Sequence, residues 1–86
     1  MVEAEFDFAT ESRRVEDVFR NALGNNTALK TSEGWRGRVH VKVVSPLFDG
    51  KSEAQKQELA WEILREGIGS DASVVSLVLA FGMDEL

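Results

Sequence analysis

Residues 45–52, Ser-Pro-Leu-Phe-Asp-Gly-Lys-Ser, join the most strand-like segment of this chain to its most helix-like segment. Pro46 lacks a backbone N–H and has a fixed φ, so it ends a strand. Gly50 can adopt a positive φ, which favours a turn at this point. Ser52 and Gln55 have the spacing of a capping box, in which each side chain bonds the other residue's backbone amide. The stretch therefore predicts a strand, a tight connection and then a helix.

Hydrophobic periodicity predicts the elements that precede this stretch. Apolar residues three and four positions apart predict a helix over residues 11–23, with Thr10 or Ser12 as its N-cap. Alternation of apolar and polar residues predicts a short strand over residues 27–31 and a longer one over residues 35–45. We expect these two strands to pair as an antiparallel hairpin.

The segments that follow the stretch complete the fold. Residues 53–66 have the apolar spacing of a long helix ended by Gly67 and Gly69, and we expect Phe48 to be buried beneath it. Residues 74–80, Val-Val-Ser-Leu-Val-Leu-Ala, have the continuous apolar character of a strand buried within a sheet. A strand–helix–strand crossover makes its two strands parallel. The expected fold is α+β in two layers, with the order α-β-β-α-β and helices on one face of a three-stranded mixed sheet.

The chain divides into one domain and two short ends. We expect a single α+β domain over residues 11–82, an N-terminal extension over residues 1–10 and a C-terminal tail over residues 83–86. In the extension, apolar and acidic residues alternate. This pattern is compatible with an added edge strand or with a docked tail.

Composition excludes several functions. The 86 residues allow one shared core. The sequence has no cysteine, which excludes disulfides, thiolate nucleophiles and zinc–thiolate sites. No secretion signal and no apolar run of about 20 residues is present, so we expect a soluble cytoplasmic protein. No nucleophile–base pair or metal-ligand set can be assembled from the residues, and we therefore expect neither an enzyme nor a bound metal or cofactor.

A basic stripe is the most distinctive surface feature that the sequence predicts. Arg36, Arg38, His40 and Lys42 occupy every second position of one strand, with Trp35 at its end, so these side chains share one face. Cations beside an indole suit single-stranded nucleic acid. The simpler interpretation, which the net charge of −5 favours, is an ordinary solvated strand face. Alternatively, the acidic residues of the N-terminal extension neutralise the stripe.

Three further features have weaker signals. Lys51 belongs to a Gly-Lys-Ser sequence at residues 50–52 that resembles the end of a phosphate loop. The glycine that would begin such a loop is replaced by Ser45, so only anion binding at the helix start remains. Residues 34–37, Gly-Trp-Arg-Gly, match the Gly-x-x-Gly of KH domains but lie in a hairpin loop, which favours an ordinary turn. Trp61 lies beside the inner stripe of its helix, where it contacts either a partner or the edge of the core.

The chain resembles the BolA-like family around its central stretch. The resemblance rests on Val-Ser at residues 44–45, Phe-x-Gly-Lys-Ser at residues 48–52 and the long helix that follows. It implies a fold similar to type II KH domains. It also implies links to monothiol glutaredoxins, shared iron–sulfur clusters and nucleic acid.

The chain also departs from the pattern of that family. Residues 56–58 are Lys-Gln-Glu where the family has Arg-His-Arg, and neither residues 31–37 nor residues 74–76 contain the expected Cys or His. Iron–sulfur clusters need thiolate or imidazole ligands, and the only imidazole belongs to His40, in the middle of a strand. We therefore expect a binding or regulatory module that acts through a protein partner without a cluster. A monothiol glutaredoxin is a weakened candidate partner, and single-stranded nucleic-acid binding is the alternative function.

Overall fold

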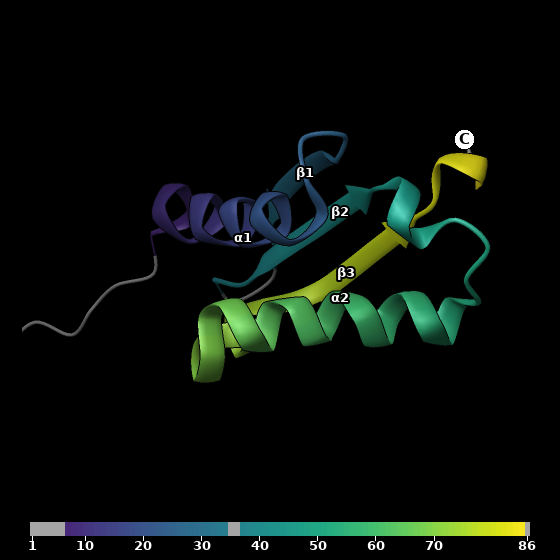
Figure 1. Ribbon diagram of the computed structural model, residues 1–86. Coiled ribbons are helices and arrows are strands. Elements are labelled where there is room, and N and C mark those ends of the chain that lie inside the picture. The colour runs from purple at the N-terminus through teal and green to yellow at the C-terminus, as the bar shows by residue number, and fades with distance from the viewer. Residues whose placement is uncertain (1–6, 35–36, 86) are drawn as a thin grey trace, which may run out of the picture.

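The computed structural model describes residues 7–34 and 37–85. The chain forms helix α1 (Phe8–Leu23), strands β1 (Ala28–Glu33) and β2 (Val39–Val44), helix α2 (Glu53–Ile68) and strand β3 (Val75–Phe81). Three short 3₁₀ turns complete the order: η1 (Pro46–Phe48), η2 (Gly69–Val74) and η3 (Met83–Glu85). Figure 1 shows that η1 and η3 lie beside each other, where β2 and β3 end.

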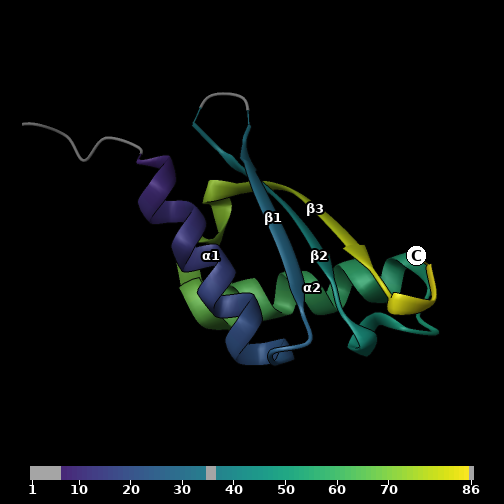
Figure 2. The same ribbon diagram turned by 90° about the horizontal axis from the view of Figure 1, so that it is seen from above.

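The sheet has three strands in the order β1-β2-β3, with β1 antiparallel and β3 parallel to β2. Both helices pack against the same side of this sheet, as the two views together show (Figures 1 and 2). The predicted α+β class, element order, hairpin and parallel crossover are therefore confirmed. The other side of the sheet faces away from the helices.

The core lies between the helices and the sheet. Val39, Val41 and Val43 alternate along β2 and are at most 2% exposed, because they face the helices. Phe19 of α1 and Leu64 of α2 pack on them and are fully buried. This two-layer arrangement positions every residue that is discussed below.

The connector has the structure that its sequence predicts. The Ser45 backbone N–H donates to the Phe81 carbonyl at 3.0 Å, and the chain then leaves the sheet. Phe48 is fully buried. The capping box of α2 is complete, since the Gln55 N–H donates to Ser52 Oγ at 3.2 Å and the Ser52 N–H donates to Gln55 Oε1 at 2.9 Å.

The first helix begins earlier than predicted. Asp7 is its N-cap and accepts the Ala9 N–H at 3.1 Å, so the expectation of Thr10 or Ser12 is wrong. The chain is already helical at Phe8, so the alternative of an edge strand does not apply from this residue onward. Phe8 is half-buried and packs against the core. Residues 1–6 of the predicted extension lie outside the described residues.

The other strand and helix boundaries also shift. β2 begins at Val39 rather than at residue 35, because the chain reverses through Gly37 at φ 70°. α2 continues through Gly67, which the prediction made a helix end, and stops at Gly69 with φ 73°. Gly67 lies where α2 approaches Val18 of α1, since an added Cβ would come within 2.5 Å of that side chain. This glycine therefore serves packing between the helices.

The expectation that the last strand is buried on both faces is wrong. β3 is an edge strand of the sheet and only its inner face, at Val75, Val78 and Ala80, is buried. Leu77 and Leu79 point to the other side and are 42% and 44% exposed. An apolar strand is usually taken as buried because exposing leucine is unfavourable. Here the two leucines mark a surface that needs a functional explanation.

None of the helices in the described part of the chain is both long and apolar enough to span a bilayer.

Candidate functional site

The open face of the sheet carries the most distinctive surface of the described structure. We define the open face as the nine outward side chains that the strand register aligns in three rows across the sheet. These rows are Ser32–His40–Leu77, Lys30–Lys42–Leu79 and Ala28–Val44–Phe81. Basic residues thus lie on the β1/β2 side of the face, and apolar residues lie along β3.

Lys30 and Lys42 are direct cross-strand partners in the antiparallel pair. Like charges at directly opposed positions destabilise a sheet. No carboxylate belongs to the open face, and within residues 7–34 and 37–85 neither ammonium group forms an ion pair. The pair therefore concentrates positive charge on one face of a protein whose net charge is −5.

The lysines also border a small apolar patch. Lys42 Nζ lies 5.5 Å from the centre of the Phe81 ring, a cation–π contact. Beside it is a shallow hollow of about 170 Å³, which Lys30 and Lys42 line together with Ala28, Leu29 and Val44. The hollow is open to solvent and has room for a side chain from a partner rather than for a small-molecule substrate.

Exposed large apolar residues cluster on β3 and at the end of the sheet. Leu77 and Leu79 lie on the open face, while Leu47 of η1 and Met83 of η3 are 51% and 47% exposed just beyond the ends of β2 and β3. Isolated exposed leucines are normal, whereas Leu77 and Leu79 are neighbours on one face of the sheet.

The described residues include Arg38, His40 and Lys42 of the predicted basic stripe. His40 and Lys42 are on the open face, whereas Arg38 precedes β2 and its guanidinium donates to the Ser73 carbonyl at 2.6 Å. This hydrogen bond uses Arg38 to connect the start of β2 to η2. Trp35 and Arg36, the other members of the stripe, lie outside the described residues.

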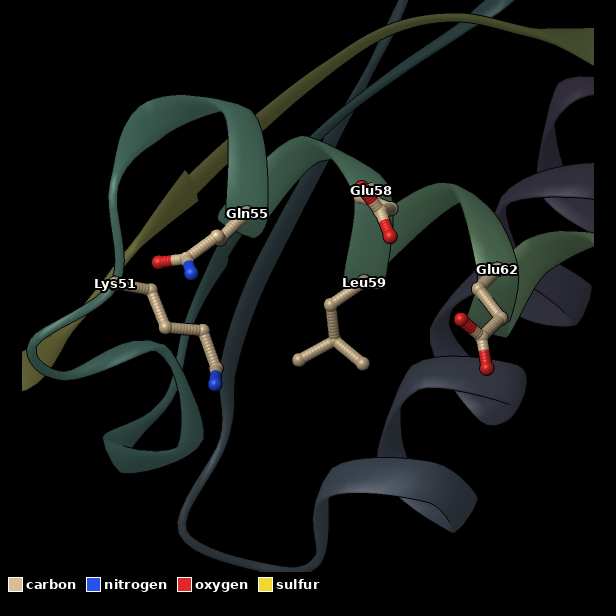
Figure 3. Close-up of a pocket in the computed structure, with 5 residues that line it drawn as sticks. All are labelled: Lys51, Gln55, Glu58, Leu59 and Glu62. Carbon is tan, nitrogen blue, oxygen red and sulfur yellow. The ribbon is translucent and has the colours of Figure 1, made fainter.

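Lys51 and Trp61 belong to a different surface. Both lie on or next to α2, which covers the opposite side of the sheet, so the structure does not bring them together with His40 and Lys42. Figure 3 shows Lys51 and Gln55 at one end of a pocket along α2, with Leu59 between Lys51 and the acidic Glu62. Glu58 and Glu62 line the same pocket, and their negative charge disfavours an anion there.

Trp61 is half-buried against the core edge and has a defined hydrogen-bond partner. Its Nε1–H donates to Gln57 Oε1 at 3.2 Å, and Gln57 Nε2 donates to the carbonyl of Val78 at 2.8 Å. The two side chains thus cover part of the free edge of β3. This arrangement gives Trp61 a structural role at the edge of the sheet.

The start of α2 is already occupied by groups of the protein itself. The Gly50 N–H donates to Asp84 Oδ2 at 3.1 Å, and the Ser52 N–H is used in the capping box. Asp84 in turn donates its own N–H to Asp49 Oδ1 at 3.2 Å. Because Asp84 accepts the Gly50 N–H and Gln55 accepts the Ser52 N–H, an external anion would compete with both side chains.

Lys56 is the one buried charged residue of the described structure. It is 2% exposed, and its Nζ lies 2.7 Å from Glu53 Oε1 and 2.7 Å from Glu85 Oε1. These hydrogen bonds raise the pKa of Lys56 above its ordinary value of 10.5. They lower the pKa of Glu85, which also accepts the Gly82 N–H. The arrangement is a structural clamp, since both carboxylates are used by the lysine.

The described residues do not suit an iron–sulfur cluster or another metal. They contain no group of three or more His, Cys, Asp or Glu side chains placed to hold a metal ion. The single imidazole, that of His40, projects from the second residue of β2. A ligand set for a cluster would have to come from elsewhere.

Comparison with solved structures identifies the fold. The chain is similar to the BolA domain of SufE1 from Arabidopsis thaliana, with a TM-score of 0.70 and 20% sequence identity. The alignment covers 90% of this chain and 96% of that one. Comparisons with protein-family models and with curated proteins find no match. The protein is thus a small α+β domain with the BolA-like fold, as the motif at residues 48–52 predicts.

Sequence reasoning misses the main features of the open face. The sequence places Lys30 in a short strand, but its alignment with Lys42 depends on a register that the sequence does not specify. Leu77 and Leu79 belong to an apolar run that predicts a core strand. The one available signal is their separation by two positions, which places both on one face of a strand.

Proposed function

We propose that this chain is a non-enzymatic BolA-like binding module that acts through protein–protein interaction, with the open face of its sheet as the contact surface. The observation that supports it most is the exposure of Leu77 and Leu79 side by side on a face that neither helix covers. Each of these side chains is already more than half buried, so covering the remainder under a partner would be favourable by roughly 1 kcal/mol for each leucine. The lysines beside them would set the orientation of the partner.

A comparative pull-down from lysate tests this proposal. The tagged chain and its Leu77→Ser/Leu79→Ser variant are used as baits after nuclease treatment, and retained proteins are quantified by mass spectrometry. We expect the wild type to retain a protein that the variant loses. The control bait is Leu47→Ser, which changes an equally exposed leucine outside the open face. Equal retention by the wild type and the double variant, both folded by circular dichroism, would refute the proposed surface.

A monothiol glutaredoxin is one candidate partner, because the BolA-like fold suggests it. The chain has no cysteine, its only histidine is His40 near the start of β2, and the described residues contain no group of three or more potential metal ligands. We therefore propose that any such complex would form without a ligand to a shared cluster from this chain. Mixing the chain with a purified apo-glutaredoxin, and following binding by calorimetry, tests this point directly. Binding that requires iron and sulfide would contradict it.

Single-stranded nucleic-acid binding is the second candidate function. It is favoured by the cations Lys30, His40 and Lys42 on one face, which could contact phosphates. Anisotropy of a fluorescent oligothymidylate, measured against salt, provides the test. Binding would have to weaken steeply with salt and be lost in Lys30→Glu/Lys42→Glu. Affinity that is insensitive to salt, or that survives this double change, would exclude it.

A further inference from the structure

We infer that the open face binds an acidic amphipathic segment of a partner protein. Carboxylates of this segment would lie on Lys30 and Lys42, and its apolar side chains would lie on Leu77 and Leu79. The inference rests on the proposed function, because it specifies the chemistry of the partner for the same surface. Three observations carry it: the charge of the face, its division into two halves and the nature of its apolar residues.

The charge of the face is the first argument. Two ammonium groups at directly opposed positions repel each other, and among the described residues no carboxylate on this face compensates for them. A carboxylate placed between Lys30 and Lys42 would interact favourably with both. Most other described cations of the chain already have partners, such as Lys56 with Glu53 and Glu85, Arg20 with Glu16 and Arg38 with Ser73.

The division of the face into two halves is the second argument. The register places Lys30, Lys42 and Leu79 in a single row that crosses all three strands. Neighbouring strands lie about 4.8 Å apart, so the outer members of this row are separated by about 10 Å. That distance is close to the diameter of one helix or one extended segment with its side chains. A single segment can therefore contact both halves, with acidic residues on one flank and apolar residues on the other.

The nature of the apolar residues is the third argument, and it disfavours nucleic acid. Single strands are bound by aromatic platforms on which bases stack. The exposed apolar side chains of this face are leucines, and its aromatic residue, Phe81, is half-buried with Lys42 above its ring. Leucines provide apolar contact area without a stacking surface. A protein segment with apolar side chains matches them better.

Selection from a displayed library of random 16-residue peptides tests the inference even though the partner is unidentified. The targets are the full chain, Lys30→Glu, Lys30→Glu/Lys42→Glu and Leu77→Ser/Leu79→Ser. Against the wild type we expect enrichment of peptides that combine Asp or Glu with Leu, Ile or Phe. These peptides should bind the Lys30→Glu variant at least tenfold more weakly. The doubly reversed variant should instead enrich peptides that carry Lys or Arg.

The single variant also controls for folding. Lys30→Glu places a carboxylate opposite Lys42 and should raise the Tm, so weaker binding by this variant cannot result from unfolding. Weakened binding together with a raised Tm is the expected pair of results. Undiminished binding by Lys30→Glu would overturn the inference.

The remaining outcomes separate this inference from the proposed function. Enriched peptides that depend on Leu77 and Leu79 but lack acidic residues would overturn the acidic partner and leave the docking face intact. Peptides that bind the leucine double variant as well as the wild type would overturn both. No enrichment of peptides, combined with salt-dependent binding of a 12-nucleotide oligothymidylate, would overturn both in favour of nucleic acid.

Discussion

Lys56 of α2 and Glu85 of η3 are joined by an ion pair of 2.7 Å, although they are 29 positions apart and Lys56 is almost completely buried. The pair fixes the C-terminal turn against the start of the long helix. Asp49 and Asp84 strengthen the same junction through hydrogen bonds to backbone amides. The junction therefore joins the turn that follows β3 to the start of α2 and to the connector before it.

The ion pair predicts a dependence of stability on pH. The hydrogen bond from Lys56, followed by that from the Gly82 amide, lowers the pKa of Glu85 from its ordinary value of 4.5. A carboxyl group whose pKa is lower in the folded state stabilises the fold above its unfolded pKa, and this stabilisation is lost as the pH falls through its folded pKa. We expect Glu85→Gln to lower the Tm at neutral pH and the difference from the wild type to shrink below about pH 4.5.

Thermal melts by circular dichroism over an acid pH series measure this effect. The matched control is Glu62→Gln, which changes an exposed carboxylate on the outer side of α2. Its effect should be small at every pH. A Tm difference for Glu85→Gln that stays constant from neutral to strongly acidic pH would rule out the ion pair as its cause.

Two adjacent residues of η1 predict effects of very different size on stability. Phe48 is fully buried in the core, whereas Leu47 is 51% exposed. Phe48→Ala should lower the free energy of unfolding by about 3–5 kcal/mol, because it leaves a cavity in the core. Leu47→Ala should change it by no more than about 0.5 kcal/mol. Urea denaturation of both variants provides the measurement. Similar midpoints for the two variants would show that Phe48 is not buried in the core.

The sequence predicts the fold well because its strongest signals are local. Pro46, the Ser52–Gln55 capping box and the apolar stripes of the two helices determine where elements start and stop, independently of their neighbours. The alternating valines of β2 likewise identify its inner face. These local signals are consistent with one another, and only a few topologies satisfy them together.

The candidate site is harder to predict because it depends on relationships between strands. An apolar run such as residues 74–80 does not show whether its strand is central or at an edge. The opposition of Lys30 and Lys42 follows from the hairpin register, and Glu85 reaches Lys56 only after the chain has folded. Arg38 is another example. Its periodicity predicts a place in the surface stripe, but the sequence does not show that its guanidinium donates a hydrogen bond to the Ser73 carbonyl.

The opposed lysines predict a variant that is more stable than the wild type. Lys30→Glu replaces a repulsive cross-strand pair with an attractive one and should raise the free energy of unfolding by about 0.2–1 kcal/mol. Lys51→Glu is the matched control, because it makes the same charge change beside Glu62 and away from any opposed lysine. Urea denaturation at low salt should separate the two variants. Destabilisation by Lys30→Glu would contradict the register.

The contact between the helices predicts that Gly67 cannot be enlarged without cost. A Cβ at this position would lie 2.5 Å from Cγ1 of Val18, whose branched side chain has little rotamer freedom. Gly67→Ala should destabilise the protein by about 1–3 kcal/mol through overpacking, offset by about 1 kcal/mol of helix propensity. In a Val18→Ala background the two Cγ contacts disappear and only a 3.1 Å approach to Cβ of residue 18 remains, so the same substitution should cost less. A double-mutant cycle tests this coupling, and additive effects would exclude the contact.

The hydrogen bond from Gln57 to Val78 predicts how the free edge of β3 is protected. Gln57 Nε2 occupies the Val78 carbonyl at 2.8 Å, and Trp61 Nε1–H holds the glutamine from the other side at 3.2 Å. An uncovered edge strand exposes backbone groups that pair with other chains, and β3 also carries the exposed Leu77 and Leu79.

Removing this side chain should therefore affect both stability and association. Gln57→Ala should lower the free energy of unfolding by about 0.5–1.5 kcal/mol and increase self-association at high concentration. Glu58→Ala is the control, because it changes an adjacent exposed residue of the same helix. Sedimentation velocity across a concentration series measures association, and adding Leu77→Ser/Leu79→Ser to Gln57→Ala should reverse it. A monomeric Gln57→Ala variant at all concentrations would show that α2 itself, rather than this side chain, blocks the edge.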